Sequence, residues 1–353
     1  MTLLYGFESL KDIASARVTE VGVNVVNTAI TQSVAEHNRQ MSAIMTLLAK
    51  PITDFKVTYK TPTAARLAAL DEFGRARPIK TMGKYDVSYP IQSAGVAWGT
   101  TRIAREKMTV QEASDATAAL IAADIRWMRD HILAALFANA AWTFVDEEHG
   151  SLTIKGPANG DTDEYLQIAG TDAGTTDDHF KAQAAAIADA ANPFSSDYDE
   201  LTEHPENGGE AVALVATSLV SSISGLTNFI PVKDSNVQQG SASDVLVGNL
   251  GLTLPGKIIG YVDKVWIAEW KAVPTGYYVM CSSQGEPPLA MRQHPETALQ
   301  GFNRVAERND HPFLESQWER HAGFGAWNRV GVVVRRIGNA NYAIPTNYSS
   351  PMA

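Results

Sequence analysis

Cysteine is nearly absent from the chain, which has Cys281 as its one thiol among 353 residues. A single thiol cannot form an intrachain disulfide, so a disulfide-stapled secreted scaffold is excluded. Cys281 follows Met280 in an apolar run that has no charged neighbour. This setting predicts a buried, unreactive thiol rather than a nucleophile.

Long apolar runs are also missing. The longest, residues 132–145, is shorter than a membrane span and contains Asn139. Glu8 and Lys11 interrupt the apolar residues of the N-terminal segment, which carries no basic leader, so we expect no signal peptide. These features predict a protein that is made or assembled in the cytoplasm and has no membrane partner.

The sequence lacks the common motifs of enzymes: a phosphate loop, a dinucleotide-binding glycine pattern and a nucleophile elbow. Gly323-Phe324-Gly325 has no third glycine, and we interpret it as a turn between strands. His311, Glu315 and His321 are the nearest approach to a metal set, but their spacing fits no single helical face. We therefore predict no catalytic residue, no cofactor site and no metal site, and we do not expect an enzyme.

Basic residues are fewer than acidic ones, 29 against 39, which gives a formal charge of −10. This net negative charge argues against a protein that binds nucleic acid with its whole surface. Residues 146–210 hold 16 acidic and 2 basic residues, a local charge of −14 that leaves +4 for the rest. We interpret this segment as a solvated acidic surface. The alternative is a cation site, because Asp161-Thr162-Asp163-Glu164 resembles the start of a calcium loop, although Tyr165 and Leu166 follow where an oxygen ligand and a glycine belong.

An apolar stripe predicts a helix in the second half of residues 1–50, with Pro51 as its end. Its members recur at helical spacing: Val26, Ile30, Val34, Met41, Met45 and Leu48. This helix is either part of the core or an arm that lies on another subunit.

Residues 71–107 predict a long β-hairpin. Tyr85, Val87, Tyr89 and Ile91 alternate with polar residues and Pro90, and a second alternating run with Val96 and Trp98 follows Ser93-Ala94-Gly95. Basic residues outnumber acidic ones here; they are Arg75, Arg77, Lys80, Lys84, Arg102, Arg105 and Lys107. Because a lone two-stranded hairpin is marginally stable in water, we expect it to lie on its own domain or on a neighbouring chain.

A long helix is predicted from Thr109 to about Phe144. Thr109 and Glu112 form a capping box, and apolar residues keep one helical face as far as Leu136. Such a helix would be roughly 50 Å long, at about 1.5 Å per residue, which suits the spine of an extended molecule.

The remainder predicts short elements of both kinds. We expect a hairpin of Ser151–Lys155 with Glu164–Ala169 and an alanine-rich helix at Asp178–Ala191 that Asn192-Pro193 stops. A mixed α/β unit follows. Its predicted strands are Ala211–Ala216, Val245–Val247, Lys257–Val262, Val265–Ala268 and Tyr277–Cys281, and one or two closing strands fall within Gln317–Arg336.

The order of these elements resembles that of the major capsid proteins of tailed bacteriophages, whose fold is named after a Hong Kong phage isolate. The resemblance is carried by the segments DEFGRARPIKTMGKYDVSYPIQSAGVAWGTT, TVQEASDATAALIAADIRWMRDHILAALF and WERHAGFGAWNRVGVVVRR. It implies an α+β fold. The implied parts are an N-terminal arm (1–70), an extended β-hairpin loop (71–108), a peripheral domain with a spine helix (109–208), an α/β axial domain (209–285) and return strands of the peripheral domain (286–353).

The resemblance further implies a head protein that self-assembles into hexamers and pentamers of an icosahedral shell around double-stranded DNA. The implied location is the virion capsid, assembled in the host cytoplasm. The expected partners are other copies of the chain, a separate scaffolding protein, a portal protein, a decoration protein and weakly held DNA. The expected subunit-interface residues of the extended loop are Arg75, Arg77, Lys80, Lys84, Tyr85, Tyr89, Trp98 and Arg102.

Two alternatives stay open at this point. The same fold serves encapsulin-like nanocompartments, which enclose a cargo enzyme. The second alternative is a hydrolase or another metal-dependent enzyme that uses the acidic segment.

Overall fold

The computed structural model divides the chain into two compact units. The first consists of Met1–Ala43, Ile91–Arg129 and Gln293–Ala322, and the second of Ile44–Pro90, Asp130–Arg292 and Gly323–Ala353. The structure describes residues 17–44, 47–60, 69–70, 72–76, 84–169, 175–232, 256–308, 313–350 and 352. Each unit is assembled from segments far apart in the sequence, whereas the predicted division into five parts follows the chain; those boundaries stay a prediction.

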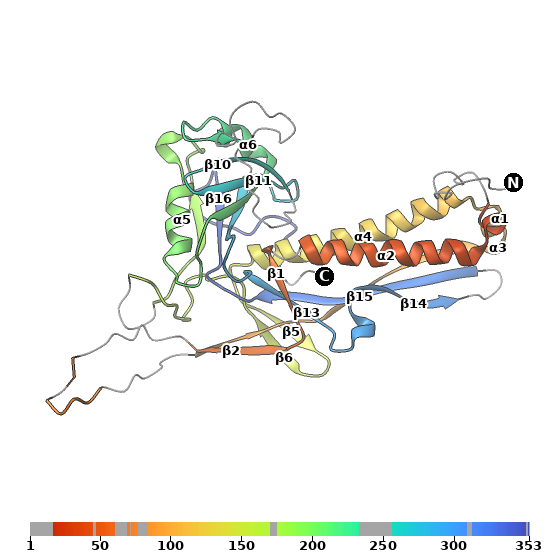
Figure 1. Cartoon of the computed structure of the whole chain (residues 1–353), viewed down its shortest axis with the longest axis horizontal. Helices are drawn as coiled ribbons and strands as arrows, with labels where there is room; N and C mark the ends of the chain where they lie inside the picture. The colour runs from red at the N-terminus through yellow and green to blue at the C-terminus, as the bar shows by residue number, and fades with distance from the viewer. Residues whose placement is uncertain are drawn as a thin grey trace. The chain divides into compact units, whose positions relative to one another are not determined.

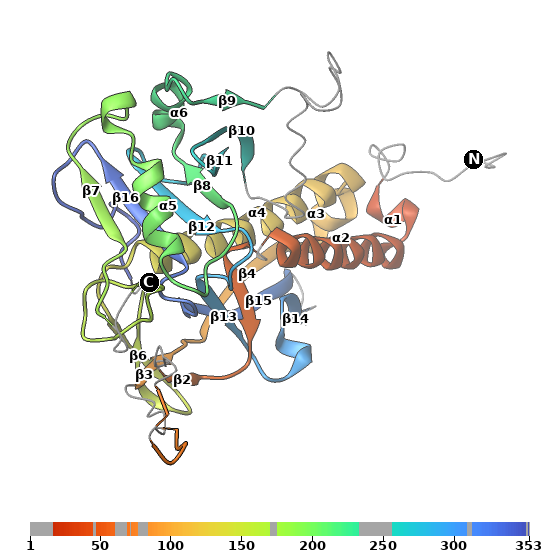
Figure 2. The ribbon, with the colours of Figure 1, turned by 60° about the vertical axis from the view of Figure 1, so that its left-hand side comes forward.

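The first unit packs two long helices on antiparallel strands. Strand β15 pairs with β4 and with β14, and Trp318 lies opposite Val96 on one side and opposite Arg304 on the other. Helices α2 and α4 lie side by side along these strands (Figures 1 and 2). The elements with residues in this unit are α1 (Val18–Val21), α2 (Val23–Ile44), β4 (Gln92–Thr101), α3 (Arg102–Lys107), α4 (Val110–Phe137), η3 (Thr297–Leu299), β14 (Phe302–Arg308) and β15 (Phe313–Ala326).

The core of the first unit comes from one face of each helix. Val34 of α2 and Leu120 of α4 are buried against Phe302 and Trp318 of the strands, and the two rings stack at 5.7 Å. Val26, Ile30 and Val34 of the predicted apolar stripe lie in or against the core of this unit, so this part of the stripe is confirmed as a core face of α2. Amphipathic helices gain most of their stability from burying such a face. The predicted end at Pro51 is wrong, because α2 ends at Ile44 and Pro51 lies in the strand β1 (Ala49–Ile52).

The start of α4 confirms the predicted capping box. The Thr109 backbone N–H donates to Glu112 Oε2 at 2.9 Å, and the Glu112 N–H donates to Thr109 Oγ1 at 3.2 Å. Two donors that a helix start leaves without partners are satisfied in this way.

The second unit is built on a mixed sheet of seven strands in the order β7-β16-β12-β8-β11-β10-β9. The central strand β8 is buried along its whole length and pairs in parallel with β11 and antiparallel with β12. Helix α5 packs on β12 and β16. The elements are β7 (Phe180–Gln183), η2 (Asp189–Ala191), α5 (Phe194–Thr202), β8 (Ala211–Val215), α6 (Thr217–Ser224), β9 (Ile230–Pro231), β10 (Lys257–Val262), β11 (Val265–Glu269), β12 (Tyr277–Ser282) and β16 (Val332–Ile337).

Three short ladders complete the second unit. They pair β1 (Ala49–Ile52) with β13 (Leu289–Gln293), β2 (Lys56–Lys60) with β3 (Lys84–Ser88), and β5 (Trp142–Asp146) with β6 (Gly150–Ile154). The predicted strands at Ala211, Lys257, Val265 and Tyr277 are confirmed to within a residue. The predicted strand 245–247 lies outside the described residues.

The predicted hairpin is wrong in its pairing. The Tyr85 run forms β3, which pairs with β2, whereas the Val96 run forms β4, which pairs over ten residues with β15. Alternation shows which side of a strand is buried, but it carries no information on the partner strand. The hairpin that does exist joins β2 to β3 through residues 61–83.

The predicted spine helix is too long by seven residues. It ends at Phe137, and Trp142–Asp146 form β5 instead. The aromatic and β-branched side chains of this stretch favour a strand. The partner strand β6 supplies the ladder, so the predicted pairing of Ser151–Lys155 with Glu164–Ala169 is wrong as well.

The predicted helix Asp178–Ala191 is wrong despite its alanines. Phe180–Gln183 form β7, which pairs in parallel with β16, and Phe180 is buried there. Sheet pairing and burial of an aromatic ring override intrinsic helix propensity. Asn192 ends only the short 3-10 helix η2 (Asp189–Ala191). Pro193 is the N-cap of α5, and the Phe194 N–H donates to Asn192 Oδ1 at 3.1 Å.

Gly323 and Gly325 lie within β15, so the predicted turn is wrong too. A Cβ at Gly323 would lie 2.3 Å from the Pro90 carbonyl oxygen, and one at Gly325 would lie 3.0 Å from the Tyr89 ring. The two glycines therefore permit a close approach of backbone and ring in the second unit.

Candidate interaction surface

The β2–β3 hairpin is the element that carries most of the predicted interface residues. Tyr59 lies opposite Tyr85, and Val57 lies opposite Val87. The paired ends Lys60 and Lys84 are joined by residues 61–83, so this connection is the loop of the hairpin.

One face of the hairpin packs on the rest of the second unit. Tyr59 and Tyr85 stack at 5.1 Å, and Tyr59 meets Trp327 edge-on at 5.9 Å. Val87 and Tyr89 are fully buried in the same cluster. Burial raises the pKa of Tyr59 to about 12, so the phenol stays neutral and hydrogen-bonds with the Tyr89 hydroxyl at 3.4 Å. The base of the hairpin is therefore held in place by contacts within a single chain and needs no neighbouring subunit.

The opposite face of the hairpin is exposed and charged. Lys56 Nζ lies 2.8 Å from Asp86 Oδ2, and the Thr58 hydroxyl donates to Asp86 Oδ1 at 2.7 Å. The hydrogen bonds from Lys56 and Thr58 hold the pKa of Asp86 below its ordinary value. Exposed ion pairs of this kind contribute little to stability.

The predicted interface residues lie in different environments. Tyr89 belongs to the core, which corrects its prediction as a surface anchor, and Tyr85 is half-buried in the aromatic cluster. Trp98 of β4 packs partly against the core of the first unit. Lys84 is exposed on β3, and the exposed Arg75 lies over the Phe73 ring at 5.6 Å. Arg77, Lys80 and the side chain of Arg102 lie outside the described residues.

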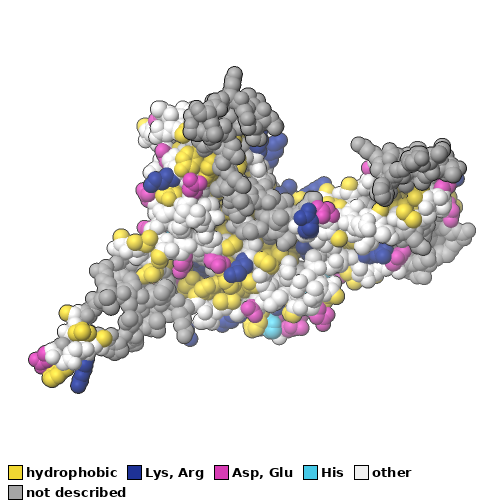
Figure 3. All heavy atoms as spheres, in the orientation of Figure 1, with side chains coloured by type: hydrophobic (Ala, Val, Ile, Leu, Met, Phe, Trp, Pro, Cys, Tyr) yellow, Lys and Arg dark blue, Asp and Glu magenta, His cyan; other side chains and the backbone are white. Residues whose placement is uncertain are grey.

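Exposed apolar side chains occur in the described part of the connection. Phe73 is 74% exposed and Leu70 is 61% exposed. Large exposed apolar groups that stand together mark interaction sites more often than isolated ones do. On the face that Figure 3 shows, by contrast, basic and acidic side chains are interspersed over the described residues, and neither kind forms a large patch.

The acidic segment is not a purely solvated surface. Arg329 is 1% exposed, and its guanidinium donates to Asp161 Oδ2 at 2.8 Å and also to Asp163. Lys155 Nζ lies 2.5 Å from Asp163 Oδ2. The two aspartates of the suspected calcium loop therefore hold cations of the chain itself, and this candidate cation site is not supported.

Further buried charge networks occur in both units, and sequence patterns did not reveal them because the partners lie far apart in the chain. They join Asp124 to His37 and Arg320, Asp146 to Arg292, Asp197 to Arg335 and Tyr278, and Asp177 to His179 and His204. Buried charges of this kind are costly unless they are paired.

Two of the other residues considered for chemistry, Cys281 and His321, lie in the described part of the chain. Cys281 is fully buried, and burial raises the pKa of its thiol to about 12, so the predicted inert thiol is confirmed. His321 Nδ1 lies 2.8 Å from Ser93 Oγ, while His311 and the side chain of Glu315 lie outside the described residues.

A cavity of about 190 Å³ lies beside the aromatic cluster. Its lining includes Tyr59, Tyr85, Tyr165, His204, Glu206 and Glu286. The cavity is small and its lining is partly polar. The described side chains that line it do not form an arrangement suited to acid–base or nucleophilic catalysis.

Solved structures of two phage chains have the same fold. A chain of Mycobacterium phage Patience is 19% identical, and the match covers 99% of both chains with a TM-score of 0.68. A chain of the bacteriophage PhiM1 mature capsid is 9% identical over 83% of this chain and 86% of that one, with a TM-score of 0.50. A chain of the capsid of a native GTA particle is 12% identical over 84% and 91%, with a TM-score of 0.47.

No protein-family profile matches the chain, and no curated protein sequence matches it. At such low identities the structural likeness shows the fold alone. The predicted α+β fold of the phage capsid type is confirmed. None of the helices in the described part of the chain has the length and apolarity needed to span a membrane.

Proposed function

We propose that the chain is the major capsid protein of a tailed bacteriophage, a structural protein rather than an enzyme. The observation that carries the proposal is the match over 99% of both chains to a phage chain, together with the match to a mature capsid. Copies would assemble into hexamers and pentamers of an icosahedral shell around double-stranded DNA, and the protein would reside in the virion capsid. Identical chains close into rings and shells through heterologous interfaces.

We place the extended loop of this capsid chain at residues 61–83. The β2–β3 base is held on the second unit by Tyr59, Tyr85 and Trp327, so the loop leaves from a fixed position. Its exposed Phe73 and Arg75 are of the residue types enriched in interface cores. The basic residues predicted for this region would meet an acidic patch of the adjacent copy, which favours orientation and register.

The other expected partners follow from the proposed role. A separate scaffolding protein would guide assembly, a portal protein would occupy one vertex, and a decoration protein would bind the outside. DNA would be held weakly, because a container must keep its cargo without immobilising it.

Electron microscopy of the purified protein, with light scattering for mass, tests the function. We expect closed shells of megadalton mass. A monodisperse monomer or small oligomer under all assembly conditions would contradict the proposal. Particles from the native source should contain DNA; a co-purified enzyme in place of DNA would identify a nanocompartment of the encapsulin kind.

Loop variants test the placement of the interface. Replacing residues 61–83 with Asn-Gly keeps the Lys60–Lys84 pairing, because this dipeptide suits a two-residue hairpin turn. We expect a folded chain with an unchanged circular dichroism spectrum that forms no shells.

A pair of point variants refines this test. F73A should reduce shell yield, because it removes an exposed ring, whereas the matched change E72Q on the adjacent exposed residue should not. Normal shells from both the shortened chain and F73A would place the interface elsewhere.

A further inference from the structure

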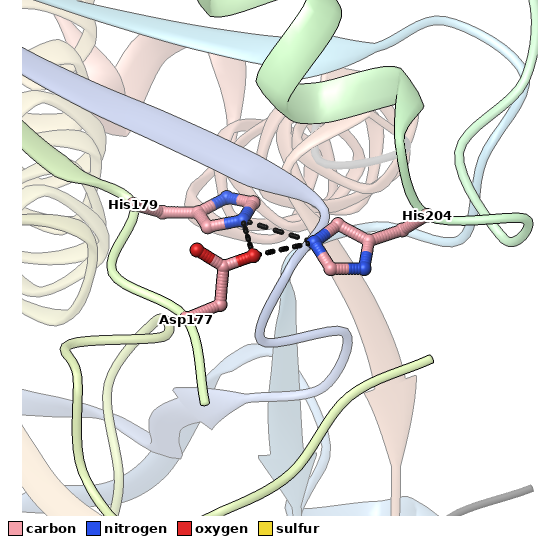
Figure 4. Close-up of side chains that lie close together, drawn as sticks. All are labelled: Asp177, His179 and His204. Carbon is pink, nitrogen blue, oxygen red and sulfur yellow. Dashed lines mark hydrogen bonds and ion pairs between the residues drawn. The ribbon is translucent and has the colours of Figure 1, made fainter. Parts of the chain in front are cut away.

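Three side chains of the second unit converge in one place. Figure 4 shows His179, which precedes β7, and His204, which follows α5, with Asp177 between them. His179 Nε2 lies 3.3 Å from His204 Nε2, and Asp177 Oδ2 lies 2.9 Å from the His204 nitrogen and 3.4 Å from the His179 nitrogen. The histidines are 0% and 1% exposed.

The hydrogen bonds around the cluster decide where the ring protons are. His179 Nδ1 lies 2.8 Å from the Val332 carbonyl oxygen, and His204 Nδ1 lies 2.9 Å from that of Leu166. A carbonyl oxygen only accepts, so each Nδ1 carries a proton. In the neutral rings both Nε2 atoms then present lone pairs to each other and to the Asp177 carboxylate.

Three acceptors that face one another need a metal cation or a proton between them. Within the part of the chain that the structure describes, the ion pairs of Asp177 are with these two histidines alone. Its other oxygen, Oδ1, accepts from the Asp178 backbone N–H at 2.7 Å. Buried acceptors without a donor are costly, so the arrangement favours a positively charged occupant.

The spacing fits a tetrahedral metal ion. Bonds of about 2.1 Å to nitrogen and oxygen place the ligand atoms of a tetrahedral zinc ion about 3.4 Å apart. The three observed separations of 3.3, 3.4 and 2.9 Å lie close to this value. The Nδ1–H groups bonded to carbonyls and the anchored Oδ1 are the outer contacts that orient metal ligands.

We propose that Asp177, His179 and His204 bind a divalent transition-metal ion of the zinc type. These three side chains supply one carboxylate and two neutral imidazoles, and the fourth position of a tetrahedral ion would be open to a water molecule. Glu203 Oε1, to which Gln167 donates at 2.7 Å, lies 3.7 Å from His204 Nε2 and adds a second negative charge near the ion. His204 also lines the cavity of about 190 Å³, which provides an entry path.

The ion would have a structural role. It would tie the segment before β7 to the end of α5, and through the Val332 carbonyl it would brace the first residue of β16. Such a site contributes its binding free energy to folding. The inference stands on this cluster alone and holds whether or not the chain forms a shell.

Metal binding to the full-length chain without an affinity tag tests the proposal. After chelator treatment and dialysis, Zn²⁺ is added, and bound metal is measured by elemental analysis and by competition with a chromophoric chelator. We expect one Zn²⁺ per chain and a lower melting temperature after chelation. Co²⁺ in its place should give the intense visible absorption of a tetrahedral site.

Variants assign the site to its residues. D177N and H204Q should each weaken Zn²⁺ binding tenfold or more, whereas H294Q, which removes a histidine outside the cluster, should bind as the unmodified chain does. Absence of stoichiometric binding, or binding that D177N and H204Q leave unchanged, would overturn the proposal and leave a shared proton as the occupant. If H204Q fails to fold, D177N and the Co²⁺ spectrum of the unmodified chain still decide.

Discussion

At the scale of single residues, buried charges define much of this molecule. Among the described residues, Arg329 is the largest fully buried side chain, and it also donates to the Gly156 carbonyl oxygen at 2.8 Å. The planar guanidinium group of Arg329 donates to two carboxylates and to backbone oxygens at once, which the ammonium group of a lysine cannot do. Removing one partner of a buried pair leaves an uncompensated charge in the interior.

Arg329→Met should therefore destabilise the chain by about 3–5 kcal/mol, measured by urea unfolding of the unassembled protein. R329K should fall between this variant and the unmodified chain. As a control, R304M removes the exposed Arg304–Glu307 pair and should cost less than about 1 kcal/mol. A cost below 1 kcal/mol for R329M would show that Asp161 and Asp163 find other partners.

Asp124 gives the stability of the first unit a pH dependence. Burial alone would raise the pKa of this carboxyl, but hydrogen bonds from His37 and Arg320 outweigh burial and hold the pKa below its ordinary value. The unfolded chain takes up this proton near pH 4, before the folded chain does. The stabilisation is thus complete above that pH and is lost as the pH falls through the lowered pKa.

We expect the free energy of unfolding to fall more steeply between pH 5 and about pH 3 in the unmodified chain than in D124N. Urea titrations at several pH values measure the two slopes. D115N alters an exposed carboxyl of the same helix and should keep the slope of the unmodified chain. Equal slopes for the unmodified chain and D124N would contradict the assignment.

At the scale of elements, sequence patterns predict the structure correctly where the stabilising contacts join residues that are close in the sequence. The capping box of α4 joins residues three apart, so its geometry follows from the sequence. Strand pairing joins residues as far apart as Thr101 and Phe313, and no local pattern specifies such a partner. This is why the start of α4 was predicted correctly and the pairing of β3 and β4 was not.

Thr109→Ala should destabilise the chain by about 0.5–2 kcal/mol, because the Glu112 N–H loses its acceptor at the helix start. Thermal unfolding followed by circular dichroism measures the change. T109S keeps the hydroxyl and should stay within a few tenths of a kcal/mol of the unmodified chain. Equal losses in both variants would point to packing of the threonine methyl group instead.

At the scale of the whole molecule, the charge distribution limits the interaction with DNA. The chain carries −10 overall, and charges of both signs alternate on the described part of the face in Figure 3. Tight DNA binders concentrate Lys and Arg on one surface and release many counterions.

Binding to double-stranded DNA should accordingly be weak, without sequence preference and lost between low and physiological salt. Filter binding or anisotropy with two unrelated duplexes at two salt concentrations measures this. A nanomolar complex that resists salt would contradict the expectation and would require a basic surface outside the described residues.

The sequence by itself determined the apolar face of α2, the start of α4, the strands β8, β10, β11 and β12, and the inertness of Cys281. Each of these depends on neighbours along the chain or on burial of an apolar run. Tertiary structure alone decided that β3 pairs with β2, that an alanine-rich stretch becomes β7, and that His179 and His204 meet at Asp177. The two histidines are 25 residues apart on different elements, and only packing of the sheet and α5 brings their ring nitrogens within 3.3 Å.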